Sequence, residues 1–108
     1  MFLIQLEELF NRVYPIENIV TLSLNHLKKN VAQGDIPTDC PEIDLEHLSL
    51  DFIRTNIFIN NTSEQKPFFR VSFGVVLPNH EDYIFRYDVD FNTFSEILDD
   101  YVYNNPII

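Results

Sequence analysis

The clearest pattern in the chain is an alternation of apolar and polar residues in two neighbouring segments, 69–77 and 83–91. A period of two is typical of strands that bury one face and leave the other mixed. The stretch PNHED between the segments is rich in turn-forming residues, so the two segments are predicted to form a β-hairpin. Its alternating apolar positions are Phe69, Val71, Phe73, Val75, Leu77, Tyr83, Phe85, Tyr87, Val89 and Phe91.

The length of the loop predicts how the hairpin pairs. If residues 78–82 form the loop, Leu77 faces Tyr83, and each earlier apolar residue faces a later one at steps of two. On the other face the same register places Arg70 opposite Asp90 and Ser72 opposite Asp88.

A further strand is predicted before the hairpin, within residues 43–59. Leu48, Leu50 and Phe52 share one parity, whereas Ile53, Ile57 and Ile59 share the other. A strand whose apolar residues change faces partway along indicates a β-bulge or bend, here between Phe52 and Asn56. Residues 60–67, NNTSEQKP, then predict a turn.

The N-terminal third predicts two helices, because its apolar residues recur at steps of three and four. The pair Tyr14-Pro15 separates them, since the residue before a proline disfavours the helical region and proline suits a first turn. Gly34 fits the position that follows the second helix.

The C-terminal segment also predicts a helix. Thr93 and Glu96 have the spacing of a capping box. Five apolar residues follow at helical spacing: Phe94, Ile97, Leu98, Tyr101 and Val102. The predicted order is therefore helix, helix, strand, strand, strand, helix. We expect one α+β domain over residues 1–108, an antiparallel β-meander of three or four strands with helices packed on one face.

Charge adds the first functional constraint. The net charge is −10, and the excess lies in two segments: residues 35–51 have six acids and no lysine or arginine, and residues 81–108 have seven acids and one arginine. This charge disfavours direct binding to nucleic acid or to an anionic membrane, and it favours a basic protein partner.

Candidate chemistry is sparse. The single cysteine, Cys40, has no histidine or cysteine at a zinc-ligand spacing, and the two glycines form no phosphate-binding loop. We therefore expect no enzymatic activity, no cofactor and no metal. The first residues do not resemble a signal peptide and no apolar run has the length of a membrane span, so a cytoplasmic location is expected.

Two acidic patterns are candidate sites. Asp88 and Asp90 project from one face of a strand, where they form either a cation site that needs a third ligand or an outer face that docks a basic partner. Glu42, Asp44 and Glu46 also alternate. They share one face if the segment is extended, or they begin a helix, and the sequence leaves both open.

The leading functional hypothesis is a non-enzymatic acidic protein that neutralises a basic partner, as immunity proteins and antitoxins do with a toxin domain such as a nuclease. An inhibitor of a nucleic-acid-binding protein fits equally well. The alternatives are a structural or regulatory subunit that self-associates through a sheet edge, and a metal-dependent hydrolase. The candidate partner-binding residues are Asp88, Asp90, Glu96, Asp99, Asp100, Tyr103, Glu42, Asp44 and Glu46. The sequence does not choose between the two acidic segments and does not give the oligomeric state.

Overall fold

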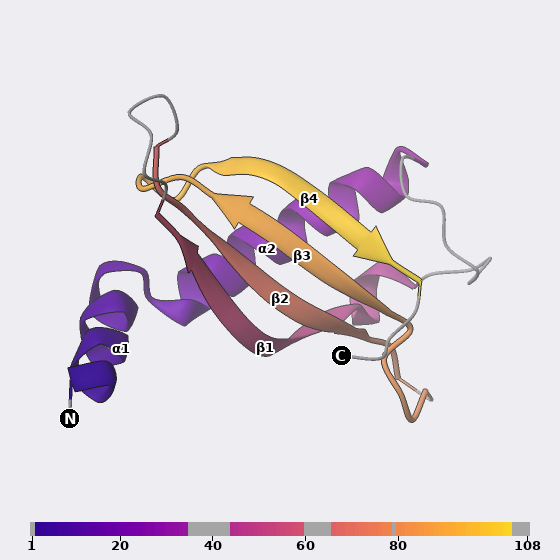
Figure 1. Ribbon diagram of the computed structural model, residues 1–108. Helices are drawn as coiled ribbons and strands as arrows, with labels where there is room; N and C mark the ends of the chain where they lie inside the picture. Colours follow the sequence, from indigo (N-terminus) through magenta and orange to yellow (C-terminus); the bar gives the residue numbers. More distant parts are fainter. Residues whose placement is uncertain (1, 35–43, 60–65, 79, 105–108) are drawn as a thin grey trace.

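The computed structural model describes residues 2–34, 44–59, 66–78 and 80–104. Two helices come first, followed by a short 3-10 helix and four strands that form one antiparallel sheet in the order β1-β2-β3-β4 (Figure 1). The predicted α+β fold with an antiparallel meander is therefore confirmed. The elements are α1 (Phe2–Val13), α2 (Ile16–Ala32), η1 (Leu45–His47), β1 (Ser49–Phe58), β2 (Phe68–Val76), β3 (Phe85–Phe91) and β4 (Ile97–Tyr103).

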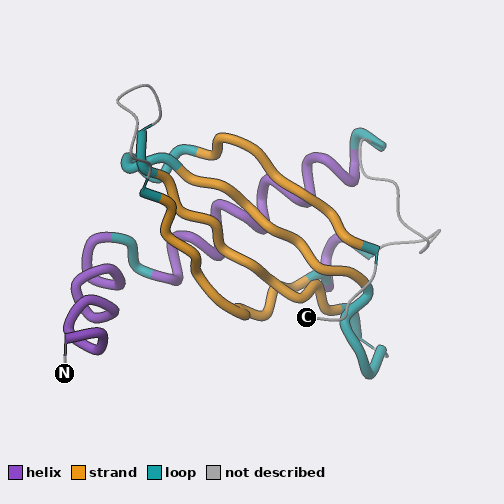
Figure 2. Tube along the Cα trace, in the orientation of Figure 1, coloured by secondary structure: helices purple, strands orange, loops and turns teal. Residues whose placement is uncertain are grey.

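The helix boundaries lie where the sequence predicts them. α1 ends at Val13, and Pro15 precedes the first turn of α2. After α2, Gly34 has a φ of 74°, a left-handed conformation that glycine adopts without steric cost. α2 lies across one face of the sheet, whereas α1 lies beyond the outline of the sheet (Figure 2).

The predicted pairing of the hairpin is confirmed from Phe69–Phe91 to Val75–Phe85. The predicted pair Leu77–Tyr83 is wrong, because both residues lie outside the paired strands and the ring of Tyr83 covers Gly74 on the other face. β2 and β3 pair antiparallel with Phe73 opposite Tyr87 and Arg70 opposite Asp90. In β1 the register against β2 shifts between Phe52 and Arg54, as the change of parity predicts. The predicted turn at residues 60–67 falls largely outside the described residues, and residues 35–43 lie outside them as well.

The core lies between the sheet and α2. Alternate residues of β2 and β3 have almost no solvent exposure, and the apolar stripe of α2 packs against them. The buried apolar residues are Ile19, Leu27, Leu48, Phe69, Val71, Phe73, Val75, Leu77, Phe85, Tyr87, Val89 and Phe91.

The C-terminal element is a strand, and the predicted helix from Thr93 is wrong. β4 pairs antiparallel with β3, with Tyr87 opposite Val102 and Asp88 opposite Tyr101. A helix here would leave the backbone groups along one side of β3 without sheet partners, although every residue of β3 except Arg86 is buried. The free energy lost by leaving β3 without a partner is therefore larger than the free energy that the segment would gain as a helix.

The residues that resemble a helix cap instead form the turn between β3 and β4. Asn92, rather than Thr93, is the capping residue: its side-chain oxygen accepts hydrogen bonds from the backbone N–H groups of Phe94 and Glu96, both at 2.9 Å. Ser95 has a φ of 62°, which closes the turn. The backbone N–H of Asn92 donates to the carbonyl of Glu96 at 2.9 Å, so the loop proper is residues 93–95. A three-residue loop that ends in a left-handed residue is a common hairpin connection.

Replacing Ser95 with glycine should have opposite effects on stability in this turn and in a helix. We expect Ser95→Gly to raise the free energy of unfolding by about 0.5–1 kcal/mol, because glycine removes the cost of the left-handed conformation. In a helix the same change would lower it by about 0.5 kcal/mol, because glycine is a poorer helix former than serine. Urea unfolding measures the difference, and Thr93→Gly in the same turn is the control that should only destabilise.

Candidate functional site

The face of the sheet opposite α2 carries the Asp-x-Asp pair, and the register builds it from three rows of residues. One row runs from Asn56 through Arg70 and Asp90 to Asp99. The next runs from Arg54 through Ser72 and Asp88 to Tyr101, and the third from Asp51 through Gly74 and Arg86 to Tyr103. Each aspartate of the pair therefore lies among side chains from four strands.

Arg70 and Asp90 form a two-point ion pair. The guanidinium Nε lies 2.7 Å from Oδ1 of Asp90, and a terminal nitrogen lies 3.0 Å from Oδ2. The hydrogen bonds to Asp90 raise the pKa of Arg70 above its usual value. The same guanidinium lies near the rings of Phe58 and Tyr101, at 5.3 Å and 4.9 Å from their centroids. The sequence-based pairing of Arg70 with Asp90 is thus confirmed.

Asp88 is covered in a similar way. A terminal nitrogen of Arg86 lies 3.3 Å from Oδ2 of Asp88, and the guanidinium carbon lies 4.1 Å from the ring centroid of Tyr103. The ring of Tyr83 covers Gly74, where a Cβ atom would come within 2.4 Å of that ring. Aromatic and arginine side chains therefore form a layer over this face.

The expectation that Asp88 and Asp90 lie on an exposed outer face is wrong. They are only 3% and 5% exposed, because Arg86 and Arg70 cover them. Little of either carboxylate faces a partner. Both oxygens of Asp90 and Oδ2 of Asp88 are already paired with a guanidinium, which competes with any cation for them. The pair therefore stabilises the sheet in this structure and offers no open cation site.

Asp100 lies on the other face, toward α2. Its Oδ2 accepts hydrogen bonds from the hydroxyl of Tyr87 at 2.7 Å and from the amide of Asn30 at 2.9 Å, and His26 lies 3.6 Å away. Burial, with the contribution of Asp100, raises the pKa of Tyr87. Asp100 thus ties α2 to the sheet.

Glu96, Asp99, Asp100 and Tyr103 would share the outward side of a helix, but in the observed turn and strand they do not form one surface. Asp99 and Tyr103 are exposed on the open face, whereas Asp100 is turned to the core side. Glu96 lies in the β3–β4 turn, where it accepts a hydrogen bond from Asn92. The alternation of a strand separates side chains that a helix would have gathered.

A different set of acids gathers at one end of the sheet. η1 leads into β1, and the start of β1 pairs with the end of β2, next to the connection to β3. The segment from η1 into β1 and the connection between β2 and β3 both lie at the end of the sheet opposite α1 (Figure 1). We call this region the acidic end and define it by five exposed acids: Asp44, Glu46, Asp51, Glu81 and Asp82.

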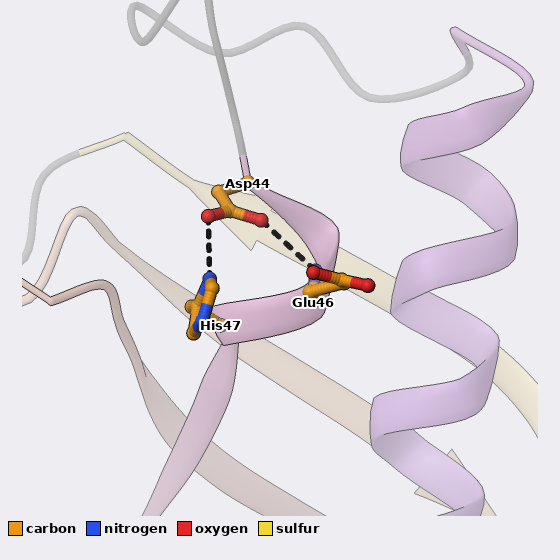
Figure 3. Close-up of side chains that lie close together, drawn as sticks. All are labelled: Asp44, Glu46 and His47. Carbon is orange, nitrogen blue, oxygen red and sulfur yellow. Dashed lines mark hydrogen bonds and ion pairs between the residues drawn. The ribbon is translucent and has the colours of Figure 1, made fainter.

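Within the acidic end, Asp44 organises η1. One of its oxygens accepts the backbone N–H of Glu46 at 3.1 Å, and the other lies 2.6 Å from Nδ1 of His47 (Figure 3). The hydrogen bond with His47 lowers the pKa of Asp44. Asp44 thus caps a 3-10 turn, which neither of the two predicted conformations included. Glu42 lies outside the described residues.

The opposite end of the molecule is apolar, which the sequence did not predict. α1 has no buried residue, and a groove of about 370 Å³ lies between it and β1, lined in part by Leu3, Leu6, Phe52 and Ile57. An amphipathic helix is usually covered by its own domain. The spacing shows that α1 has an apolar face, but it does not show what covers that face.

Comparison with family models, curated proteins and solved structures finds no match to this chain. Within the described residues, no helix combines the length and the apolar character that a membrane crossing requires.

Proposed function

We propose that this chain is a non-enzymatic binding protein whose acidic end docks a basic protein partner and blocks its action. The observation that carries the proposal is the separation of charge along the fold. Five exposed acids gather at one end, and residues 44–53 and 77–85, which form it, contain no lysine or arginine. Acids that converge without neighbouring cations attract a basic surface and speed its approach.

The arginines of the sheet do not offset this charge. Arg70 and Arg86 are engaged by Asp90 and Asp88, which are themselves buried. These pairs neutralise each other inside the open face, so neither arginine is free to offset the exposed acids at the end of the sheet. The sheet thus neutralises its internal charge and keeps its acidic charge outside.

Aromatic side chains stand near the acids. Tyr103 ends β4 opposite Arg86, and Tyr83 lies beside Gly74, which pairs with Asp51. Tyrosine supplies a large contact area with a polar tip and is enriched among residues that dominate binding energy. The combination suits an inhibitor of a lysine- or arginine-rich domain, such as an immunity protein against a nuclease toxin, acting in the cytoplasm.

The test compares two variants with the same change in charge. Asp44→Lys/Glu46→Lys alters the acidic end, and Glu8→Lys/Glu17→Lys alters exposed acids of the two helices. Tagged proteins are used to capture partners from the native host at low salt. We expect the wild type and the helix variant to retain one basic protein, and the acidic-end variant to lose it.

The captured protein must then be inhibited. Its activity, or its toxicity on expression, should fall when the wild type is added and should persist with the acidic-end variant. Capture of the same protein by both variants, or of a protein without basic character, would contradict the proposal.

The self-association alternative has a specific observation in its favour, although not at the sheet edge. β1 is an edge strand, but its bulge and the exposed Arg54 at the bulge oppose pairing with another strand. Among the described residues, six of the fourteen large apolar residues that are exposed belong to α1, more than to any other element. For the hydrolase alternative, Asp44, Glu46 and His47 are the one group of possible metal ligands that converges within the described residues, and all three are exposed.

A further inference from the structure

We infer that α1 is a dimerisation helix that packs antiparallel against α1 of a second copy of this chain. The first observation is its exposure. Phe2 is 86% exposed and Leu9 is 52% exposed, although both belong to the apolar face of the helix. Full burial of such a side chain stabilises an assembly by about 1.5–3 kcal/mol. The exposed apolar residues on this face are Phe2, Leu3, Leu6, Leu9 and Val13.

The attachment of α1 to its own domain does not use this face. Phe10 makes the main contact, with its ring 5.0 Å from that of Tyr14 and 5.1 Å from that of Phe69. The rest of the apolar stripe continues past Phe10 toward solvent and toward the groove beside β1. α1 is therefore held in place while most of its apolar surface stays open.

The spacing of the stripe is symmetric. Phe2, Leu6, Leu9 and Val13 follow one another at steps of four, three and four residues, which read the same in both directions. Two antiparallel copies related by a two-fold axis then pair Phe2 with Val13 and Leu6 with Leu9 across the interface. A two-fold interface requires such self-complementarity, and four- and three-residue steps match the seam of packed helices.

The residues that flank the stripe permit the same pairing. Leu3 and Phe10 lie on one side of it, and Gln5 and Arg12 lie on the other. The acids of α1, at positions 7 and 8, lie away from the seam at helical spacing. Like charges therefore do not meet along the antiparallel contact.

Charge identifies a second copy as the occupant. Residues 1–34 have three acids and three bases, whereas the rest of the chain carries the whole net charge of −10. α1 itself has two acids and one arginine, so two acidic molecules repel each other less at α1 than at the acidic end. A basic partner would instead gain most binding energy at the acidic end, which lies at the opposite end of the sheet.

The available area is close to what a dimer needs. Phe52 and Ile57 are 48% and 49% exposed beside the groove and extend the apolar surface of α1 onto β1. A fully buried aromatic side chain covers about 150–250 Å². On that scale these two residues and the five residues of α1, most of them about half exposed, offer on the order of 500–700 Å². A standard interface buries about 800 Å² from each partner.

The test uses the full chain and a matched pair of variants. Leu9→Glu places charge at the centre of the seam, and Ile4→Glu places it on the same helix away from the seam. Leu9 and Ile4 are 52% and 54% exposed, so neither change should unfold the domain. By sedimentation equilibrium we expect dimers for the wild type and Ile4→Glu. For Leu9→Glu we expect a dissociation constant at least about 100-fold higher.

A monomeric wild type, or equal dissociation constants for the two variants, would overturn the inference. Cross-linking checks the direction of the helices in a Cys40→Ser background. Oxidation of a mixture of Leu6→Cys and Leu9→Cys chains should give disulfides between the two different chains. Disulfides that form mainly between identical chains would show parallel helices and contradict the antiparallel arrangement. This inference does not depend on the proposed function.

Discussion

Replacing Arg70 with alanine is expected to lower the free energy of unfolding by about 1.5–3 kcal/mol, because it removes the hydrogen bonds of the guanidinium to a charged carboxylate. The substitution leaves the carboxylate of Asp90, which is 5% exposed, without its cation. It also removes the guanidinium that lies between the rings of Phe58 and Tyr101. Because a domain of this kind has about 5–15 kcal/mol of total stability, urea unfolding should show a large shift in midpoint.

Two further variants separate the buried charge from the loss of a surface arginine. Arg54→Ala removes an exposed arginine from the same face and should change stability by about 0.5 kcal/mol or less. In Arg70→Ala/Asp90→Asn no unpaired charge stays buried, so part of the loss should be recovered. If Arg70→Ala and Arg54→Ala had equal effects, the ion pair would not be the structural link described here.

Tyr87 is expected to be the second sensitive position. It has no solvent exposure, and its hydroxyl donates a hydrogen bond to Asp100 at 2.7 Å. Tyr87→Ala should lower the free energy of unfolding by about 3–5 kcal/mol, because it opens a cavity between the sheet and α2. Tyr87→Phe keeps the ring and should cost about 1 kcal/mol. Equal losses in the two variants would mean that the ring does not fill the core.

The same tyrosine predicts how stability depends on alkaline pH. Burial raises the pKa of Tyr87 in the folded chain above its usual value of 10.0. The folded state therefore holds this proton more tightly than the unfolded state, and the stability it contributes is present in full below pH 10. This contribution to the free energy of unfolding is lost as the pH rises above 10 toward the raised pKa of Tyr87 in the folded chain.

Urea unfolding of the wild type and of Tyr87→Phe across this range measures the contribution. The free energy of unfolding of the wild type should decline above pH 10, and that of Tyr87→Phe should decline less. The variant should retain some decline, because burial and the neighbouring Asp90 also raise the pKa of Tyr101. Parallel curves for the two proteins would contradict this role of Tyr87.

The sequence predicts the hairpin of β2 and β3 in detail because its signals are local. A strict alternation and a short turn define which residues face each other, and the pairing of Arg70 with Asp90 follows. The C-terminal segment shows the limit of such signals. Thr93 and Glu96 match a helix cap, but Asn92 forms a hairpin turn, because the edge of the buried strand β3 requires a partner.

The burial of the Asp-x-Asp pair depends on contacts between distant segments. Alternation places Asp88 and Asp90 on the outer face, but it does not show that Arg86 and Arg70 lie flat over them. Tyr101 and Tyr103 complete that layer only because β4 is a strand. The wrong prediction for the C-terminal helix therefore carried over into the prediction for the site.

The two proposals use opposite ends of the molecule. The acidic end lies at the start of β1, and α1 lies at the far end of the sheet (Figure 1). A dimer formed through α1 would leave both acidic ends free, so that one dimer could hold two basic partners. A dimer with two binding sites has a higher apparent affinity for a partner that is itself a dimer.

The association rate of the captured basic partner, measured as a function of salt, tests whether the acidic end is the docking site. For the wild type and for Glu8→Lys/Glu17→Lys, the rate constant should be high at low salt and should fall steeply as salt is added. For Asp44→Lys/Glu46→Lys it should be at least about tenfold lower at low salt and nearly independent of salt. The same rate and the same salt dependence in all three proteins would contradict a docking site at the acidic end.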